Sequence, residues 1–124
     1  MKITTWFVVS IHNAEDTIVS ELKVPRDEAR VYMLLLGKGK MQKDKIVSEL
    51  KLEQKNVEKA IAGLLEKGAC IQIGSEYEAL NPRFAITNMY RMVCYANNQE
   101  VKRNKIVDQL ATILEKPYED ARTK

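Results

Sequence analysis

The chain has 124 residues, of which 45% are hydrophobic and 30% charged, and its formal net charge is +3. This length and composition indicate one globular domain, residues 1–124, and exclude a disordered chain. Because the positive charge is spread evenly along the sequence, no segment is a basic arm. Any affinity for nucleic acid must therefore come from side chains that folding gathers on one surface.

Residues 1–22 are predicted to form an N-terminal helical extension. The apolar run in residues 1–13 is too short to cross a membrane, and no signal-peptide cleavage site follows it, which indicates a cytoplasmic protein with no membrane partner. The pattern of residues 1–13 fits both a helix and a strand, and we favour the helix; residues 14–21 are expected to be helical. The only histidine, His12, has no partner at metal-ligand spacing, so no metal site is expected.

A second helix is predicted to begin at Pro25, because proline loses no hydrogen bond at the first helical position and because Asp27 and Glu28 suit the positive end of the helix dipole. Gly37 and Gly39 are expected to end this helix. Three lysines in the following link are expected either to be solvated or to meet a DNA phosphate, and they are Lys38, Lys40 and Lys43.

Residues 43–67 have the pattern of a helix, a short turn and a second helix. Apolar side chains recur at helical spacing on both sides of residues 51–53, a turn so short that it must pack the two apolar stripes together, with Leu52 in the corner. This is the outline of a helix-turn-helix, in which residues 54–67 would be the recognition helix. The outer face of that helix carries polar and cationic groups, as a DNA-reading helix does and as a merely solvated helix also does.

The candidate DNA-binding residues are the polar side chains at the start of the two helices. Lysines there would meet phosphates, and side-chain amides would pair with an adenine edge. These residues are Lys43, Gln54, Lys55, Asn56 and Lys59.

Residues 69–80 (ACIQIGSEYEAL) are predicted to form a β-hairpin, because apolar and polar residues alternate on both sides of Gly74 and Ser75, which suit a two-residue turn. A hairpin directly after a recognition helix is a wing. The fold class is therefore mostly α with a small β-hairpin wing, and residues 25–80 form the core of a winged helix-turn-helix.

Residues 22–82 resemble the DNA-binding domain of archaeal TrmB-type transcriptional regulators. The family's opening helix commonly contains a sequence close to EARVYLALL, and residues 28–36 are EARVYMLLL; the family's EKG ending follows at residues 66–68, and its Tyr-x-Ala-x-x-Pro wing exit matches Tyr77, Ala79 and Pro82. The resemblance covers about half of the chain and implies binding to double-stranded DNA as a transcription regulator. The larger sugar-sensing domain of many members has no counterpart in this sequence.

Several positions depart from the family pattern. Lys51 stands where a turn glycine is usual, and Glu53 stands where a proline often opens the recognition helix. Residues 54–56 are Gln-Lys-Asn where Arg-Ser-Lys is common, so this triplet has one cation fewer. Wings of the family usually carry arginines, whereas this one has Glu76 and Glu78. Because carboxylates repel phosphates, wing contacts with DNA are not carried over.

Residues 81–116 are predicted to form two C-terminal helices. Asn81 and Pro82 have the pattern of an N-cap followed by the first helical residue, opening a helix to about residue 96. The last helix is expected from about Glu100 to Glu115, where Pro117 would stop it and leave residues 117–124 as a flexible tail.

The apolar stripes of these helices exceed what a small winged core needs to cover. The family's habits suggest a homodimer on a palindromic site, joined through the last helix at Leu110 and through Trp6 and Phe7. The alternative is that the helices wrap a monomer, since such stripes are more often core than interface.

Two functions remain open after the sequence analysis. One is a sequence-specific DNA-binding regulator that acts as a homodimer. The other is a winged-helix protein-interaction module of a transcription or other multi-subunit machinery, which the acidic wing favours. No catalytic triad, phosphate-binding glycine loop or metal-ligand cluster is present, so neither an enzyme nor a bound cofactor is expected. The two cysteines, in apolar surroundings, are expected to be buried thiols. The sequence does not identify a small-molecule effector.

Overall fold

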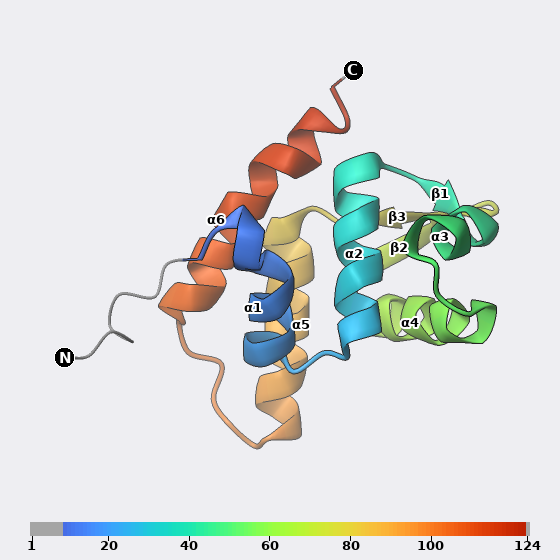
Figure 1. The fold of residues 1–124 in the computed structure, drawn as a ribbon. Coiled ribbons are helices and arrows are strands. Elements are labelled where there is room, and N and C mark those ends of the chain that lie inside the picture. The colour runs from blue at the N-terminus through green and yellow to red at the C-terminus, as the bar shows by residue number, and fades with distance from the viewer. Residues whose placement is uncertain (1–8, 124) are drawn as a thin grey trace.

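The computed structural model describes residues 9–123 and folds them into helices around a small antiparallel sheet (Figure 1). Its elements, in chain order, are the short 3₁₀ helix η2 (Ile11–Asn13), α1 (Ala14–Leu22), α2 (Arg26–Lys38), β1 (Met41–Gln42), α3 (Lys43–Leu50), α4 (Gln54–Glu66), β2 (Cys70–Ile73), β3 (Glu76–Ala79), α5 (Pro82–Ala96) and α6 (Lys105–Asp120).

Helix α2 lies in the middle of the molecule, with α1, α5 and α6 on one side and α3, α4 and the sheet on the other (Figure 1). Apolar residues lie on both sides of α2, so the helix packs against both groups of elements. Tyr32 and Leu35 have no exposed surface. The Tyr32 hydroxyl donates a hydrogen bond of 3.1 Å to the carbonyl oxygen of Leu80, at the exit of the wing. Burying the Tyr32 ring in this way joins the two halves of the molecule into one core.

The predicted helix-turn-helix is confirmed, with α3 ending at Leu50 and α4 beginning at Gln54. Lys51 ends α3 in the left-handed conformation (φ 55°), and its N–H donates to the Val47 carbonyl oxygen at 2.8 Å. A left-handed residue explains why glycine is usual at this position in the family, since a Cβ atom makes that conformation costly. Leu52 packs against the core from the corner, as expected.

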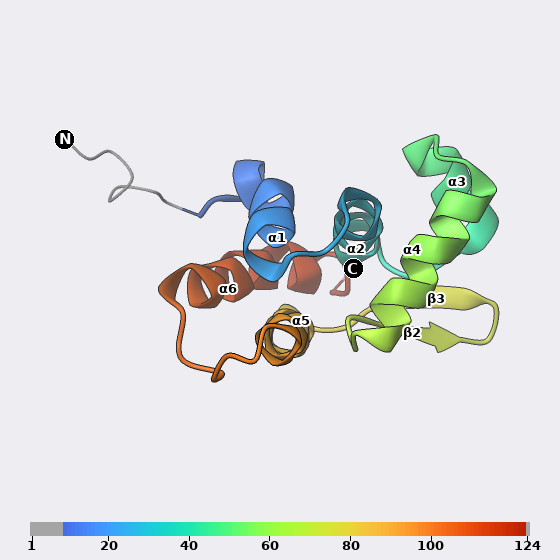
Figure 2. The same cartoon turned by 90° about the horizontal axis from the view of Figure 1, so that it is seen from below.

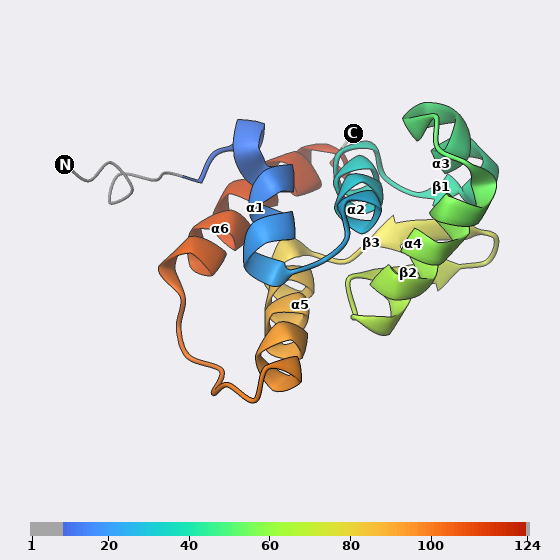
Figure 3. The same cartoon turned by 60° about the horizontal axis from the view of Figure 1, so that its bottom comes forward.

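The wing is confirmed, and it belongs to a three-stranded sheet. β2 and β3 pair from Cys70 opposite Ala79 to Ile73 opposite Glu76, and the sheet order is β1-β3-β2. Strand β1 was not predicted, because two residues are too few to show any alternation. Figure 3 shows the hairpin lying alongside α4, away from α1 and α6. The fold is therefore the predicted one, mostly α with a small β-hairpin wing.

The structure corrects several predicted boundaries in the N-terminal half. In the part of the expected helix over residues 1–13 that the structure describes, residues 11–13 form a 3₁₀ helix and residues 9 and 10 have no regular structure. Residues 1–8 lie outside the described residues. Pro25 is the N-cap of α2 and not its first residue. Helix α1 begins at Ala14 as expected and ends at Leu22.

The C-terminal region differs from its predicted structure more than the N-terminal half does. Helix α5 begins as predicted, with Asn81 accepting a hydrogen bond from the Arg83 N–H at 2.9 Å. Helix α6 begins at Lys105 and not near Glu100, because the side chain of Asn104 caps it by accepting from two backbone N–H groups. Pro117 lies inside α6, which continues to Asp120. Proline has no backbone N–H, so Pro117 cannot donate the usual helix hydrogen bond. Packing of Tyr118 on the core and the contacts of Arg122 offset this loss. The predicted flexible tail is therefore wrong for residues 118–122.

The apolar stripe of α6 is inside the molecule. Leu110 and Leu114 have no exposed surface and pack in the single core that α1, α2 and α5 also line. The prediction that Leu110 lies in a dimer interface is therefore wrong, because the stripe already has a partner within the chain. Trp6 and Phe7, the other residues of that predicted interface, lie outside the described residues. No helix within residues 9–123 has the length and apolar character needed to cross a membrane.

Candidate nucleic-acid interface

Helix α4 has one free end and one anchored end. Its N-terminal end lies at the outer edge of the molecule, far from α1, α5 and α6, and its C-terminal end points toward α5 (Figures 1 and 2). Val57, Ile61 and Leu64 bury one face against the core. The free end is thus the part of α4 that another molecule can reach, as the N-terminal part of a recognition helix must be.

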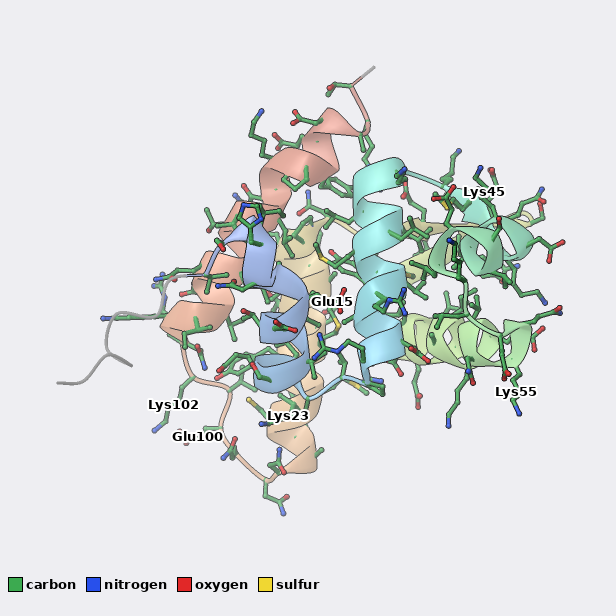
Figure 4. The ribbon with its side chains drawn as sticks, viewed as in Figure 1. Glu15, Lys23, Lys45, Lys55, Glu100 and Lys102 are labelled. Carbon is green, nitrogen blue, oxygen red and sulfur yellow. The ribbon has the colours of Figure 1, made fainter. Side chains whose placement is uncertain are left out.

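Lys55 and Lys59 lie on the exposed face of α4, one turn apart, and Figure 4 shows Lys55 directed away from the body of the protein. Within residues 9–123 neither lysine forms an ion pair. Asn56 beside them is half-buried. Two solvated ammonium groups on the free end of α4 give this surface a positive potential that an anionic partner can use.

Glu58 joins two of the other candidate residues. Its Oε2 atom accepts hydrogen bonds from Lys43 Nζ at 2.7 Å and from Gln54 Nε2 at 3.0 Å. The Lys43 ammonium, followed by the Gln54 amide, lowers the pKa of the Glu58 carboxyl, and the Glu58 carboxylate raises the pKa of Lys43. This carboxylate therefore holds the first residue of α3 and the first residue of α4 together on the exposed face.

Glu58 was not among the candidate residues predicted from the sequence, which missed this role. A signal was available for Gln54, since residues four apart on a helix face each other. No signal was available for Lys43, because its contact with Glu58 spans 15 residues and depends on the angle between α3 and α4.

The predicted lysine cluster of the link divides into two groups. Lys43 turns to Glu58 on α4, whereas Lys38 and Lys40 line a hollow of about 440 Å³ beside the wing. Lys45, labelled in Figure 4, lines the same hollow. Two carboxylates share it, and they are Glu49, which pairs with Lys45 at 3.5 Å, and Glu76. The hollow is therefore mixed in charge, unlike the free end of α4 with its two exposed lysines.

The wing is less acidic toward solvent than its sequence suggested. The Glu78 carboxylate accepts a hydrogen bond from the Arg122 guanidinium, and both side chains are more than four-fifths buried. Arg122 also donates to the carbonyl oxygens of Leu36 at 2.8 Å and Leu35 at 3.2 Å, and its guanidinium stacks 3.8 Å from the ring centre of Tyr118. Glu78 therefore faces the C-terminal segment and cannot repel DNA as a solvent-exposed carboxylate would.

A buried ion pair fixes the anchored end of α4. Lys67, the residue that follows α4, donates to Glu28 Oε1 of α2 at 2.9 Å, and Glu28 is only 7% exposed. The carboxylate fits because Gly63 of α4 has no side chain at that point. Glu28 is the first residue of the EARVY motif, so part of the motif holds α4 against α2.

A helix-turn-helix followed by a hairpin, with a polar and cationic free end on the second helix, defines a winged helix-turn-helix protein. The chain belongs to the TrmB family, described as sugar-specific transcriptional regulators, because the model of that family matches residues 19–95. This confirms the resemblance found in the sequence. No curated protein and no solved structure matches the chain.

Proposed function

We propose that the chain is a sequence-specific DNA-binding transcription regulator, not an enzyme, which places the free end of α4 in the major groove of double-stranded DNA. The observation that carries this proposal is the exposed position of Lys55 and Lys59 at that end, where neither forms an ion pair with any residue of the described part of the chain, which belongs to the TrmB family. Because such a regulator acts on the genome, we expect it in the cytoplasm.

Each side chain of the surface has a distinct part in this proposal. Lys55 and Lys59 contact phosphates and supply affinity for any sequence. Gln54 and Asn56 present amides that pair with an adenine edge. Glu58 is an acceptor for the amino group of cytosine, and its carboxylate positions Lys43 beside the backbone until DNA competes for that lysine.

We further propose that the regulator is a homodimer and that its contact runs along α5. Phe84 and Tyr95 are 65% and 67% exposed, and they lie three turns apart on one face of that helix. Exposed aromatic side chains are enriched where proteins contact each other, so this face of α5 is a candidate for the contact. A two-fold axis through α5 would place two α4 helices on a palindromic site.

A titration of duplex DNA at two salt concentrations tests DNA binding. For the double variant Lys55→Ala, Lys59→Ala, the slope of log affinity against log salt should fall by about 0.9 for each phosphate that the protein no longer neutralises. The matched control is Lys102→Ala, Lys105→Ala, which removes the same charge at the far end of the molecule, where Figure 4 shows Lys102. If both double variants bind DNA as tightly as the unchanged protein, the assignment of the recognition helix fails.

Sedimentation at micromolar concentration tests the dimer. Tyr95→Asp should give folded monomers, because this side chain is exposed in the single chain and its change does not disturb the core. Leu110→Asp should unfold the protein without passing through a stable monomer, since it buries a carboxylate in the core. An unchanged protein that sediments as a monomer would refute the dimer.

One observation favours the second candidate function, a winged-helix protein-interaction module. Ile71 and Ile73 are 40% and 45% exposed on β2, the outer strand of the wing, where a DNA-binding wing would carry cations. Exposed apolar residues on an edge strand suit a protein partner. If DNA binding fails in the titration above, this surface is the first to test with the transcription machinery.

A further inference from the structure

A cavity of about 420 Å³ lies away from the free end of α4, between the end of α1, the second half of α5 and the residue that follows α4. Figure 4 shows Lys23 at the end of α1 beside α5. The volume is within the range of pockets that bind small molecules. The lining residues are Leu22, Lys23, Lys67, Met89, Met92, Val93, Ala96 and Asn97.

The lining of this cavity is apolar with cations at its edge. Leu22 and Met89 are almost fully buried and form part of an apolar wall. Methionine side chains are flexible, so the wall can adapt to apolar groups of different shape. Among residues 9–123, Lys23 and Lys67 are the charged residues that line the cavity, and none of these residues contributes a carboxylate to the lining.

The two lysines differ in what they already bind. Lys67 Nζ donates to Glu28 Oε1, so its charge is partly compensated. Lys23 forms no ion pair within residues 9–123, and its backbone is held in the left-handed conformation (φ 55°) that ends α1. One uncompensated ammonium group therefore lies beside an apolar wall, which is an arrangement that favours a ligand with one negative charge and an apolar body.

This chemistry does not suit a free sugar. A sugar presents many hydroxyl groups that must be paired when they leave water, and the cavity offers only the Asn97 amide and two ammonium groups as polar side chains. The lining side chains thus favour an amphipathic anion over a sugar, the ligand class in the family's description.

We propose that this cavity binds a small amphipathic carboxylate, with its apolar body against Met89 and Met92 and its carboxylate between Lys23 and Lys67. Lys67 is also the C-cap of α4, where its N–H donates to the Gly63 carbonyl oxygen at 3.0 Å. A ligand that shares the Lys67 ammonium with Glu28 acts on the anchored end of the recognition helix. Only this coupling rests on the proposed function; the binding site itself does not.

The experiment uses decanoate as the probe and the methyl signals of labelled methionine as the readout. Decanoate, added below the concentration at which it forms micelles, should shift the Met89 and Met92 methyl signals in a saturable manner and leave Met33 and Met41 unchanged, because those two lie on α2 and β1, away from the cavity lining. Decanol, which has the same chain without the charge, should bind at least tenfold more weakly. Equal binding of the two compounds, or shifts spread over all four of these methionines, would overturn the proposal.

Charge reversal at the rim provides the second measurement. Lys23→Glu should weaken decanoate binding by at least tenfold, whereas the control Lys105→Glu, with the same charge change on α6, should leave it within twofold. Both side chains are exposed, so neither variant should unfold the chain. If the two variants bind decanoate equally, the cavity is not a carboxylate site but a bare apolar surface. DNA binding plays no part in either measurement, so the two proposals fail independently.

Discussion

A methyl group at Gly63 would lie 2.2 Å from Oε2 of Glu28, closer than real side-chain contacts come. Gly63 is in the interior of α4, where glycine is less favourable than alanine by about 1 kcal/mol. The chain accepts that cost because the missing side chain leaves room for a buried carboxylate, which in turn accepts the Lys67 hydrogen bond.

The first prediction is that the effect of Gly63→Ala changes sign with residue 28. In the unchanged chain the methyl group must displace Glu28, and the free energy of unfolding should fall by about 1–3 kcal/mol, the range for an overpacked core. In the Glu28→Ala background the same change should raise the free energy of unfolding by about 0.5–1 kcal/mol, the helix-propensity gain. Urea denaturation of the four proteins of this cycle measures both values. Equal effects in the two backgrounds would contradict the steric explanation.

The second prediction concerns Arg122. Arg122→Ala leaves the carboxylate of Glu78 largely buried without its partner, so the free energy of unfolding should fall by about 2 kcal/mol or more. Lys116→Ala is the control, since it breaks an exposed ion pair with Asp120 on the same helix and should cost less than about 0.5 kcal/mol. A tail that frays would make the two variants equally stable, and urea denaturation distinguishes these outcomes.

The third prediction rests on the proposed function and concerns Glu58. Glu58→Gln removes a negative charge from the DNA-facing surface and loosens Lys43, so affinity for random duplex DNA should rise severalfold. Discrimination at a cytosine position of the preferred site should fall at the same time. Glu66→Gln makes the same charge change at the anchored end of α4 and should leave both affinities nearly unchanged. If Glu58→Gln affects random and preferred DNA no more than Glu66→Gln does, Glu58 has no part in reading.

The fourth prediction concerns pH. Burial, followed by the charges of Glu78 and Glu28, raises the pKa of the Cys70 thiol from 9.0 to about 12. The folded chain therefore keeps this proton where the unfolded chain loses it. The stability that Cys70 contributes is complete below about pH 9 and is lost as the pH rises toward 12.

Unfolding of the unchanged protein and of Cys70→Ala, measured from about pH 7 to about pH 10.5, gives this contribution as the difference between the two proteins. The difference should be constant to about pH 8.5 and then shrink. A difference that stays constant up to the highest pH would show that the folded thiol ionises as the unfolded one does.

The sequence was sufficient for several features that depend on neighbours along the chain. The helical repeats of α3 and α4, the two-residue turn at Gly74 and Ser75, and the Asn81 cap are all local patterns, and the structure has each of them. The features that the sequence did not reveal are pairings across the fold. Lys43 meets Glu58 over 15 residues and Glu78 meets Arg122 over 44, and no periodicity encodes either contact.

The burial of α6 shows a second limit of sequence reasoning. Its apolar stripe was interpreted as a surface for another subunit, because a hydrophobic pattern tells that a face is covered but not what covers it. Leu110 is covered by the chain's own core, while Phe84 and Tyr95, which no stripe singled out, are exposed.

The hydrogen bonds of Arg122 to Leu36 and Leu35 close loops of 86 and 87 residues. Closing so long a loop is slow compared with forming a helix, so we expect these bonds to form after the rate-limiting step of folding. An interaction absent from the transition state leaves the refolding rate unchanged and acts only on the unfolding rate. Arg122 should then act on how long the native state lasts once it has formed, since each contribution of about 1.4 kcal/mol from this residue would lengthen that lifetime about tenfold.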